Sequence, residues 1–219
     1  MIHQVSQIIT GPASEPLTVA TVCAHLRVPA GDDDAYIASL ITEARDWVER
    51  LMGVHLMSTT IMDTLDRFPL LPNSQFWPGN PNIATPVINN DWPLSPASWA
   101  IELFKTPVQS ITTFKYYDNG GVLVTLDPSQ YLLDAVSAPA RVAPALGGFW
   151  PSCAWVANAI QISYVAGYPM AAAIPPTFLR AIKLAIGFLY DNRNAGIGTA
   201  QMDAAMRGIL TSVAIPRFG

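Results

Sequence analysis

The chain has 219 residues, of which 51% are apolar and only 13% are charged, and this composition excludes global disorder, which requires low hydrophobicity and high net charge. A formal net charge of −4 provides no chain-wide basic field for holding duplex DNA. The mean hydropathy is +0.29, yet no apolar stretch reaches the roughly 18 residues of a membrane-spanning helix. The surplus of apolar side chains therefore predicts burial in an oligomer.

Two helices are predicted near the start of the chain. The first begins at Thr18, whose hydroxyl can cap it, and ends before Pro29 and Gly31. The second begins at the acidic run 32–34, where negative charge suits the positive end of the helix dipole, and ends at Gly53. Its apolar positions recur at steps of three and four and form one face: Ile37, Leu40, Ile41, Ala44, Val48 and Leu51.

A β-rich stretch follows the second helix. From residue 57 the side chains alternate in polarity, which predicts a strand of about eight residues. An Asp-Asn-Gly-Gly turn at 118–121 predicts a hairpin, because Asn and Gly accept positive φ. Further strands are predicted over 101–104, 111–117, 122–126, 131–134, 140–143 and 159–165. An antiparallel sheet is the natural assembly of these strands.

Residues 69–100 interrupt the pattern with seven prolines, three tryptophans and a single charge. A segment of this length without regular structure is usually functional or packed against something. Trp77, Trp92 and Trp99 are therefore candidates for contact with a neighbouring subunit or a tail-side partner, although a cover over the chain's own sheet explains them equally well. An alternative is a β-rich module that binds carbohydrate or peptide, with these indoles as its stacking platform.

Two more helices are predicted over 178–192 and 199–213. The first of them is apolar on nearly all sides and must be covered on more than one. Together the elements predict an α+β fold in which helix pairs from both ends form a four-helix bundle around an inserted antiparallel β-rich domain. The expected domains are the helices of 1–55, the β-rich insertion 56–170, and the helices and tail of 171–219.

No metal or cofactor site is predicted. His3, His25 and His55 lie on separate elements without a second ligand nearby, whereas a closed zinc site needs four. The acidic run 32–34 lacks the alternating oxygen ligands of a calcium loop, so helix capping is the better interpretation.

No catalytic motif occurs either, and we expect no enzyme. A hydrolase that uses two carboxylates, such as Asp63 and Glu102, stays an alternative, but nothing selects that pair. Cys23 and Cys153 are expected to be free thiols in a reducing cytosol, where disulfides are rare.

Several short segments between residues 16 and 195 carry a further signal in their order and spacing. They are Pro16-Leu17-Thr18, Ala24-His25-Leu26-Arg27-Val28, Asp32-Asp33-Asp34-Ala35-Tyr36-Ile37, Pro107-Val108-Gln109-Ser110-Ile111, Tyr116-Tyr117-Asp118, Leu126-Asp127-Pro128-Ser129-Gln130-Tyr131, Val165-Ala166-Gly167-Tyr168, Ile174-Pro175-Pro176 and Tyr190-Asp191-Asn192-Arg193. Taken together they resemble the head-tail connector (adaptor) proteins of long-tailed bacteriophages and prophages.

The resemblance implies a structural virion protein. Such connectors form rings, usually of twelve subunits, that dock beneath the portal protein, precede a tail-side stopper or terminator protein, and continue the channel through which DNA passes without sequence-specific binding. Assembly in the host cytoplasm, a place at the head-tail interface and no membrane partner are the corresponding expectations. The long 69–100 segment departs from the family, in which a short strand connection is common.

Three sets of contact residues follow. The carboxyl-terminal segment of such connectors commonly engages the portal, which implies a docking role for Arg207, Ile209, Leu210, Val213, Ile215, Arg217 and Phe218. A ring would cover the helix that is apolar on several sides, which makes candidate subunit contacts of Phe178, Ile182, Leu184, Ile186 and Phe188. Like charge keeps DNA from adhering to a channel wall, so Glu43, Asp46 and Glu49 are candidates for that wall, with a solvated outer helix face as the simpler interpretation.

Overall fold

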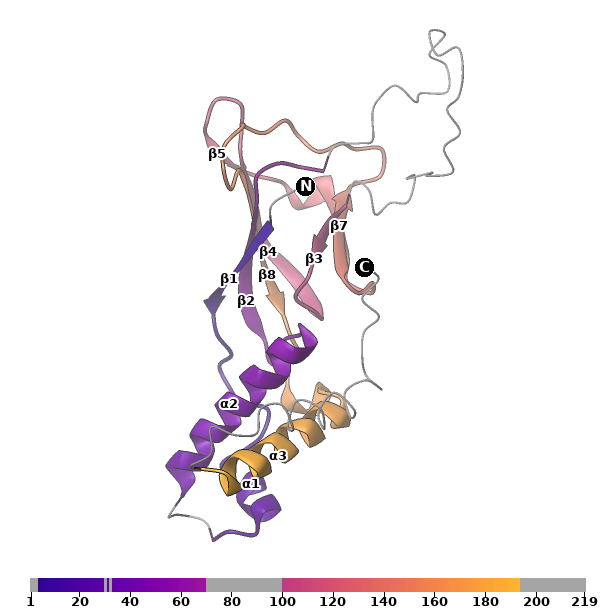
Figure 1. Cartoon of the computed structure of the whole chain (residues 1–219). Coiled ribbons are helices and arrows are strands. Elements are labelled where there is room, and N and C mark those ends of the chain that lie inside the picture. Colours follow the sequence, from indigo (N-terminus) through magenta and orange to yellow (C-terminus); the bar gives the residue numbers. More distant parts are fainter. Residues whose placement is uncertain (1–3, 30, 32, 70–99, 194–219) are drawn as a thin grey trace, which may run out of the picture. The chain divides into compact units, whose positions relative to one another are not determined.

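The computed structural model describes residues 4–29, 31, 33–69 and 100–193. In this part the chain divides into two compact units, each assembled from separate stretches of sequence (Figure 1). The strand unit takes its residues from Met1–Ile9, Thr60–Phe104 and Ser110–Val165. The helical unit takes its residues from Thr10–Thr59, Lys105–Gln109 and Ala166–Gly219. Helices and antiparallel strand pairs occur together, which confirms the α+β class.

The strands of the described residues form two sheets. The five-stranded sheet has the order β1 (Gln4–Thr10), β2 (Thr59–Leu65), β8 (Ile160–Ala166), β4 (Val108–Tyr117) and β5 (Leu123–Thr125). The three-stranded sheet has the order β3 (Ile101–Leu103), β7 (Ala140–Pro144) and β6 (Tyr131–Asp134). A short 3₁₀ helix, η2 (Pro128–Gln130), precedes β6.

The predicted hairpin is confirmed at the turn between β4 and β5. These strands pair antiparallel, with Lys115 opposite Thr125. The Asp118 carboxylate accepts hydrogen bonds from the backbone amides of Gly120, at 2.8 Å, and Val122, at 2.9 Å. The side chain therefore holds the turn closed, as Asp does in turns that mimic a backbone bond.

The core of the strand unit has an aliphatic and an aromatic part. In β2 and β8 every second side chain is buried, among them Ile61 and Ile162. Beside the sheet, the Phe68 and Trp150 rings stack with centroids 5.0 Å apart, and Phe114 packs against both at 6.1 and 5.7 Å. Aromatic pairs in this range contribute attraction beyond the area they bury.

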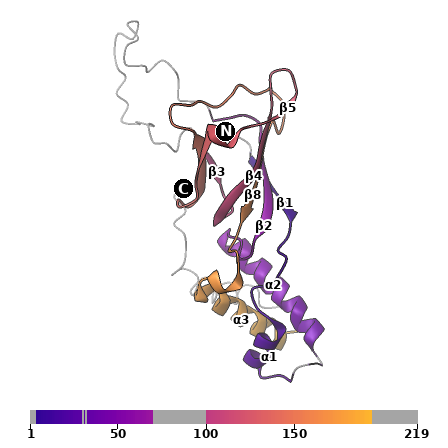
Figure 2. The ribbon, with the colours of Figure 1, turned by 180° about the vertical axis from the view of Figure 1, so that it is seen from behind.

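Three α-helices pack together in the helical unit: α1 (Val19–Leu26), α2 (Asp34–Met52) and α3 (Pro176–Asp191). They lie side by side in both views of the ribbon (Figures 1 and 2). Thr18 caps α1 as predicted, because its hydroxyl accepts the Thr21 amide at 3.3 Å. Gly53 ends α2 in the left-handed conformation with φ of 68°. A 3₁₀ helix, η3 (Ala171–Ala173), lies just before α3.

The four-helix bundle is not supported by the described residues, because they contribute only these three α-helices. The fourth predicted helix, over 199–213, lies outside the described residues. The core of the helical unit is built from the inner faces of the three helices and the chain after α2, with these residues almost fully buried: Val22, Ile37, Leu40, Ile41, Ala44, Val48, Leu56, Phe178, Ala181, Ile182, Ala185 and Ile186. No helix among the described residues combines the length and apolarity required to cross a membrane.

Candidate functional site: charged clusters and surfaces of the helical unit

A buried network of charged side chains ties α2 to the segments on either side of it. The Arg45 guanidinium donates from Nε to Glu15 Oε2 at 2.8 Å and from Nη1 to Glu49 Oε2 at 3.1 Å. Glu49 Oε1 also accepts the Leu56 amide at 2.9 Å, and the Nδ1 atom of His55 lies 3.3 Å from Glu49 Oε2. The side chains of Arg45 and Glu49 are only 9% and 6% exposed.

This network corrects the expectation for Glu49. Burial alone would raise the pKa of Glu49, but His55, the Leu56 amide and Arg45 together outweigh it, and the pKa lies below its ordinary value. Glu49 is therefore an ionised internal ligand of Arg45 and cannot line a channel wall. Among the three acids proposed for that wall, only Glu43 and Asp46 are exposed.

Glu43 and Asp46 lie on the outer face of α2, opposite the side that enters the core. Asp46 approaches Arg50 one turn later, with a separation of 3.5 Å between Asp46 Oδ2 and the Arg50 guanidinium. Both partners of this pair are more than half exposed, so the pair adds little stability.

A second cluster joins the end of α3 to the start of α2. The Arg193 guanidinium donates to Asp33 Oδ2 at 2.7 Å and lies over the Tyr36 and Tyr190 rings, 4.4 and 4.5 Å from their centroids. The Tyr190 hydroxyl donates to the same carboxylate oxygen at 2.5 Å. Hydrogen bonds from Tyr190 and Arg193 lower the pKa of Asp33.

This contact corrects part of the capping prediction. Asp33 is the residue that precedes α2, but its side chain makes no cap hydrogen bond. It accepts the hydroxyl of Tyr190 in α3 instead. Asp34, in the first turn, keeps the favourable place near the positive end of the helix dipole and accepts the Gly31 amide at 3.0 Å. Asp32 lies outside the described residues.

Replacing Asp33 by asparagine is expected to loosen the end of α3. At neutral pH, amide hydrogen exchange in the last turn of α3 should become several-fold faster, because the anionic acceptor for Tyr190 and Arg193 is lost. Because the folded pKa is depressed, this stabilisation is present above the unfolded value of about 3.9 and disappears as the pH falls through the folded pKa. The difference between Asp33→Asn and the parent should therefore shrink in acid.

Asp46→Asn, an equal change in an exposed pair, is the control and should leave exchange in α3 unchanged. Equal exchange rates in the parent and in Asp33→Asn at neutral pH would show that the cluster does not hold α3.

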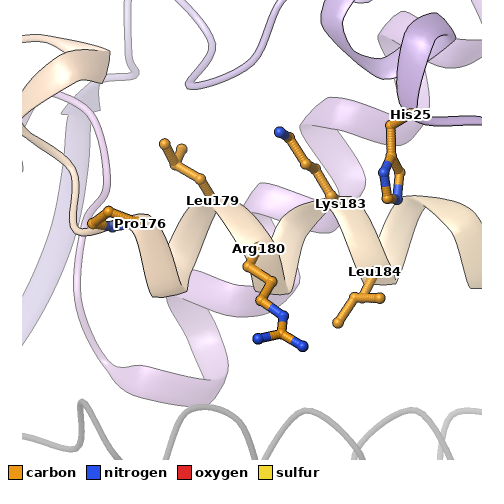
Figure 3. A pocket seen from close by; sticks show the side chains of 6 residues that line it. All are labelled: His25, Pro176, Leu179, Arg180, Lys183 and Leu184. Atoms are coloured by element: carbon orange, nitrogen blue, oxygen red, sulfur yellow. The ribbon is translucent and has the colours of Figure 1, made fainter.

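A hollow of about 330 Å³ lies between the last turn of α1 and the outer face of α3. Figure 3 shows the side chains that line it: His25, Pro176, Leu179, Arg180, Lys183 and Leu184. Two of them are cationic, none is acidic, and Leu184 is 38% exposed. The hollow thus offers positive charge beside apolar surface, a combination that suits an acidic protein partner.

The predicted subunit contacts on α3 fall on two sides of the helix. Phe178, Ile182 and Ile186 are buried in the core of the helical unit, and their side chains are already covered by the same chain. Phe188 is half-buried, and Leu184 is exposed in the hollow. Only the last two can meet a second copy without rearrangement of the core.

Asp63, the first carboxylate of the hydrolase alternative, is fully buried in the strand unit. Its Oδ2 atom accepts from the Gln4 amide at 2.9 Å and from the Tyr164 hydroxyl at 3.1 Å. Gln4 also donates to the backbone oxygen of Glu102 at 2.8 Å. Asp63 therefore connects β1, β2 and β8 internally, and burial denies it contact with a substrate in solution.

The described residues contain no group of three or more His, Cys, Asp or Glu side chains that could hold a metal ion. His25 lies at the hollow, and His55 lies in the buried network of α2. Cys23 is buried, Cys153 is half-buried, and both are free thiols.

Two predicted sets of contact residues lie outside the described residues. They are the tryptophans of the proline-rich segment, Trp77, Trp92 and Trp99, and the docking set Arg207, Ile209, Leu210, Val213, Ile215, Arg217 and Phe218.

Arg180 and Lys183 are the surface residues that sequence reasoning missed. Their spacing of three places them on one helix face, and they lie in the part of the chain with five bases and two acids, residues 171–219. That local excess of positive charge was the available signal. What the sequence did not show is that His25, from a distant helix, would lie beside them.

The same fold occurs in solved structures of gene transfer agent particles. A chain from the neck of the empty particle, computed with C6 symmetry, matches with a TM-score of 0.70 and 20% identity over 98% of this chain and 97% of that chain. Chains from the virion of the native particle and from its neck computed with C12 symmetry match with TM-scores of 0.69 and 0.65, both at 18% identity and with the same coverage. No protein-family model and no curated protein matches the sequence. The chain therefore shares the complete fold of a neck chain of these particles.

Proposed function

We propose that this protein is a structural subunit of the neck of a phage-like particle, a head-tail connector (adaptor). The observation that supports this function is the fold match to chains from gene transfer agent necks, which leaves almost no part of either chain uncovered. The connector resemblance of the sequence leads independently to the same part of the virion.

In this proposal, copies of the chain form a ring of twelve between the portal protein and a tail-side stopper or terminator protein. The ring encloses the DNA channel and makes no sequence-specific contact with the DNA. Matching chains come from necks computed with C6 and with C12 symmetry, which supports a symmetric ring. Assembly takes place in the host cytoplasm, and the product is part of the virion.

The carboxyl-terminal segment is the proposed portal-docking element. Truncation after Gly208 removes Ile209, Leu210, Val213, Ile215, Arg217 and Phe218. We expect the truncated chain to keep the circular dichroism and the thermal transition of the full chain but to lose binding to portal rings. Electron microscopy and co-sedimentation of the chain mixed with portal particles measure this binding.

A chain that lacks only Gly219 is the control and should bind like the full chain. The full chain should form closed rings, either alone or once it is mixed with portal rings. If the full chain stays monomeric and does not bind portal rings, the connector function is refuted. Portal binding by the chain truncated after Gly208 would refute only the docking role of the segment.

A further inference from the structure

We propose that the hollow formed by α1 and α3 binds the outer face of α2 from a second copy of this chain. The inference rests on the proposed ring and names the two surfaces that join its subunits. The first surface is the basic hollow, defined by Arg180, Lys183 and Leu184 with His25 at its edge. The second is the acidic face of α2, defined by Glu43 and Asp46.

The basic hollow has charges that the described part of the chain leaves uncompensated. Arg180 is exposed and Lys183 half-exposed, and neither forms an ion pair with a described residue. Leu184, which follows Lys183 in the sequence, exposes more than a third of its surface. Gly187 follows one turn later, where an added Cβ would meet only the tip of Leu26 at 3.9 Å. The basic hollow therefore combines two cations with exposed apolar surface that is accessible to a partner.

The acidic face of α2 is complementary to the hollow. Glu43 makes no hydrogen bond or ion pair with any described residue, and the ion pair of Asp46 with Arg50 is long and exposed. Facing carboxylates would meet the two cations of the hollow, while the exposed part of the Leu184 side chain loses water. Charge pairs of this kind at the rim of an interface fix its register and speed association.

The positions of the two surfaces suit a ring. Helices α2 and α3 pack against each other through their buried faces, which carry Ile41, Val48 and Ile182 among others. The acidic face belongs to the exposed side of α2, and the basic hollow belongs to α3 and the last turn of α1, so the two surfaces are separate. Two different surfaces of one unit join copies head to tail, and such contacts close into rings when the rotation permits.

The chain's own residues 194–219 are a weaker candidate for the hollow. They contain one acidic residue and two basic ones, so their charge does not complement Arg180 and Lys183. The acidic face of a second copy offers two carboxylates three residues apart on one helix. Charge complementarity therefore favours the second copy.

Charge reversal on each surface tests the proposal. One variant carries Arg180→Glu and Lys183→Glu, and the other carries Glu43→Lys and Asp46→Lys. Each variant alone would bring like charges together, so ring assembly should require a concentration at least about tenfold higher than for the parent chain. In an equimolar mixture every reversed hollow can meet a reversed face, and assembly should return to within about threefold of the parent. Sedimentation velocity and electron microscopy measure assembly, with portal rings present if the parent requires them.

The matched control carries Arg67→Glu and Lys115→Glu, which change the net charge of the strand unit equally and should leave assembly unchanged. Circular dichroism checks that every variant is folded. Normal assembly of either reversed variant alone, or no recovery in the mixture, would overturn the proposed contact while the connector function stands. A parent chain that neither forms rings nor binds portal rings would instead overturn the connector function itself.

Discussion

Replacing Gly167 by alanine is expected to destabilise the helical unit by about 3 kcal/mol or more. Gly167 has φ of +105°, a conformation that L side chains rarely adopt. A Cβ at this position would lie 2.2 Å from the Met57 carbonyl oxygen and 3.1 Å from the Ser58 nitrogen. These are backbone atoms that no rotamer change can move. A shift of the backbone at residue 167 would also be unfavourable, because the Gly167 amide donates a hydrogen bond to the Pro107 oxygen at 2.8 Å.

Thermal or urea unfolding followed by circular dichroism measures this loss. Gly31→Ala is the matched control, because Gly31 belongs to the same unit and has φ of +119° but no atom within 4 Å of the added Cβ. The Gly31→Ala variant should lose only the free energy of unfolding that corresponds to backbone strain, about 1–2 kcal/mol. An equal loss in both variants would show that the close approach of Met57 is not what requires glycine at position 167.

Replacing Arg45 by methionine is expected to lower the free energy of unfolding by about 3–5 kcal/mol, the range for breaking a buried ion pair from one side. Methionine fills much of the same volume, so the main effect is electrostatic. Glu49 would keep the Leu56 amide and His55 but lose its cation while buried, and Glu15 would lose its cation and keep only the Thr42 hydroxyl among these contacts.

Arg50→Met is the control on the same helix, since the Arg50 side chain is 71% exposed. It should change the unfolding free energy by no more than about 0.5 kcal/mol. Arg45→Lys should recover only part of the loss, because one ammonium group cannot reproduce the fork of donors that reaches Glu15 and Glu49 together. Equal stability of Arg45→Met and the parent would show that the network does not stabilise the fold.

Local sequence patterns predicted the regular elements well where the conformational preference of a single residue determines the structure. The Thr18 cap, the Gly53 end of α2 and the hairpin turn at Asp118 are each determined by a residue with a strong conformational preference. Strand β6 occurs over the predicted residues, and most of the other strands differ by one to three residues at an end. In these cases neighbours in the sequence decide the structure.

The predictions failed where the partner is distant in the sequence. Strand β1 was missed because its side chains are mostly exposed and show no alternation, so its strand structure depends on pairing beside β2. Glu49 was placed on the outer face of its helix because nothing nearby marks it as internal. Its burial depends on Arg45, which in turn needs Glu15, 30 residues away. Asp33 likewise gains its partners from the end of α3, 157 and 160 residues later.

The apolar character of α3 shows a further limit of the periodic pattern. Sequence alone could not divide its apolar residues between the subunit's own core and a neighbouring copy. In the structure, α3 packs against α1 and α2, and its residues Phe178, Ile182 and Ile186 are buried in the core of the helical unit. The surface left on α3 carries Arg180 and Lys183 beside Leu184, which is why the proposed contact between copies depends on charge as well as on apolar area.

The interleaving of the two units has a consequence for synthesis on the ribosome. The strand unit needs β8 between β2 and β4, and the helical unit needs α3 against α1 and α2, so neither can be completed before residues 160–191 have been made. Contacts that span so much of the chain form slowly, because a long loop must be closed before they stabilise anything. Nascent chains that end before these residues therefore complete neither unit, and translation products truncated there cannot reach the native fold.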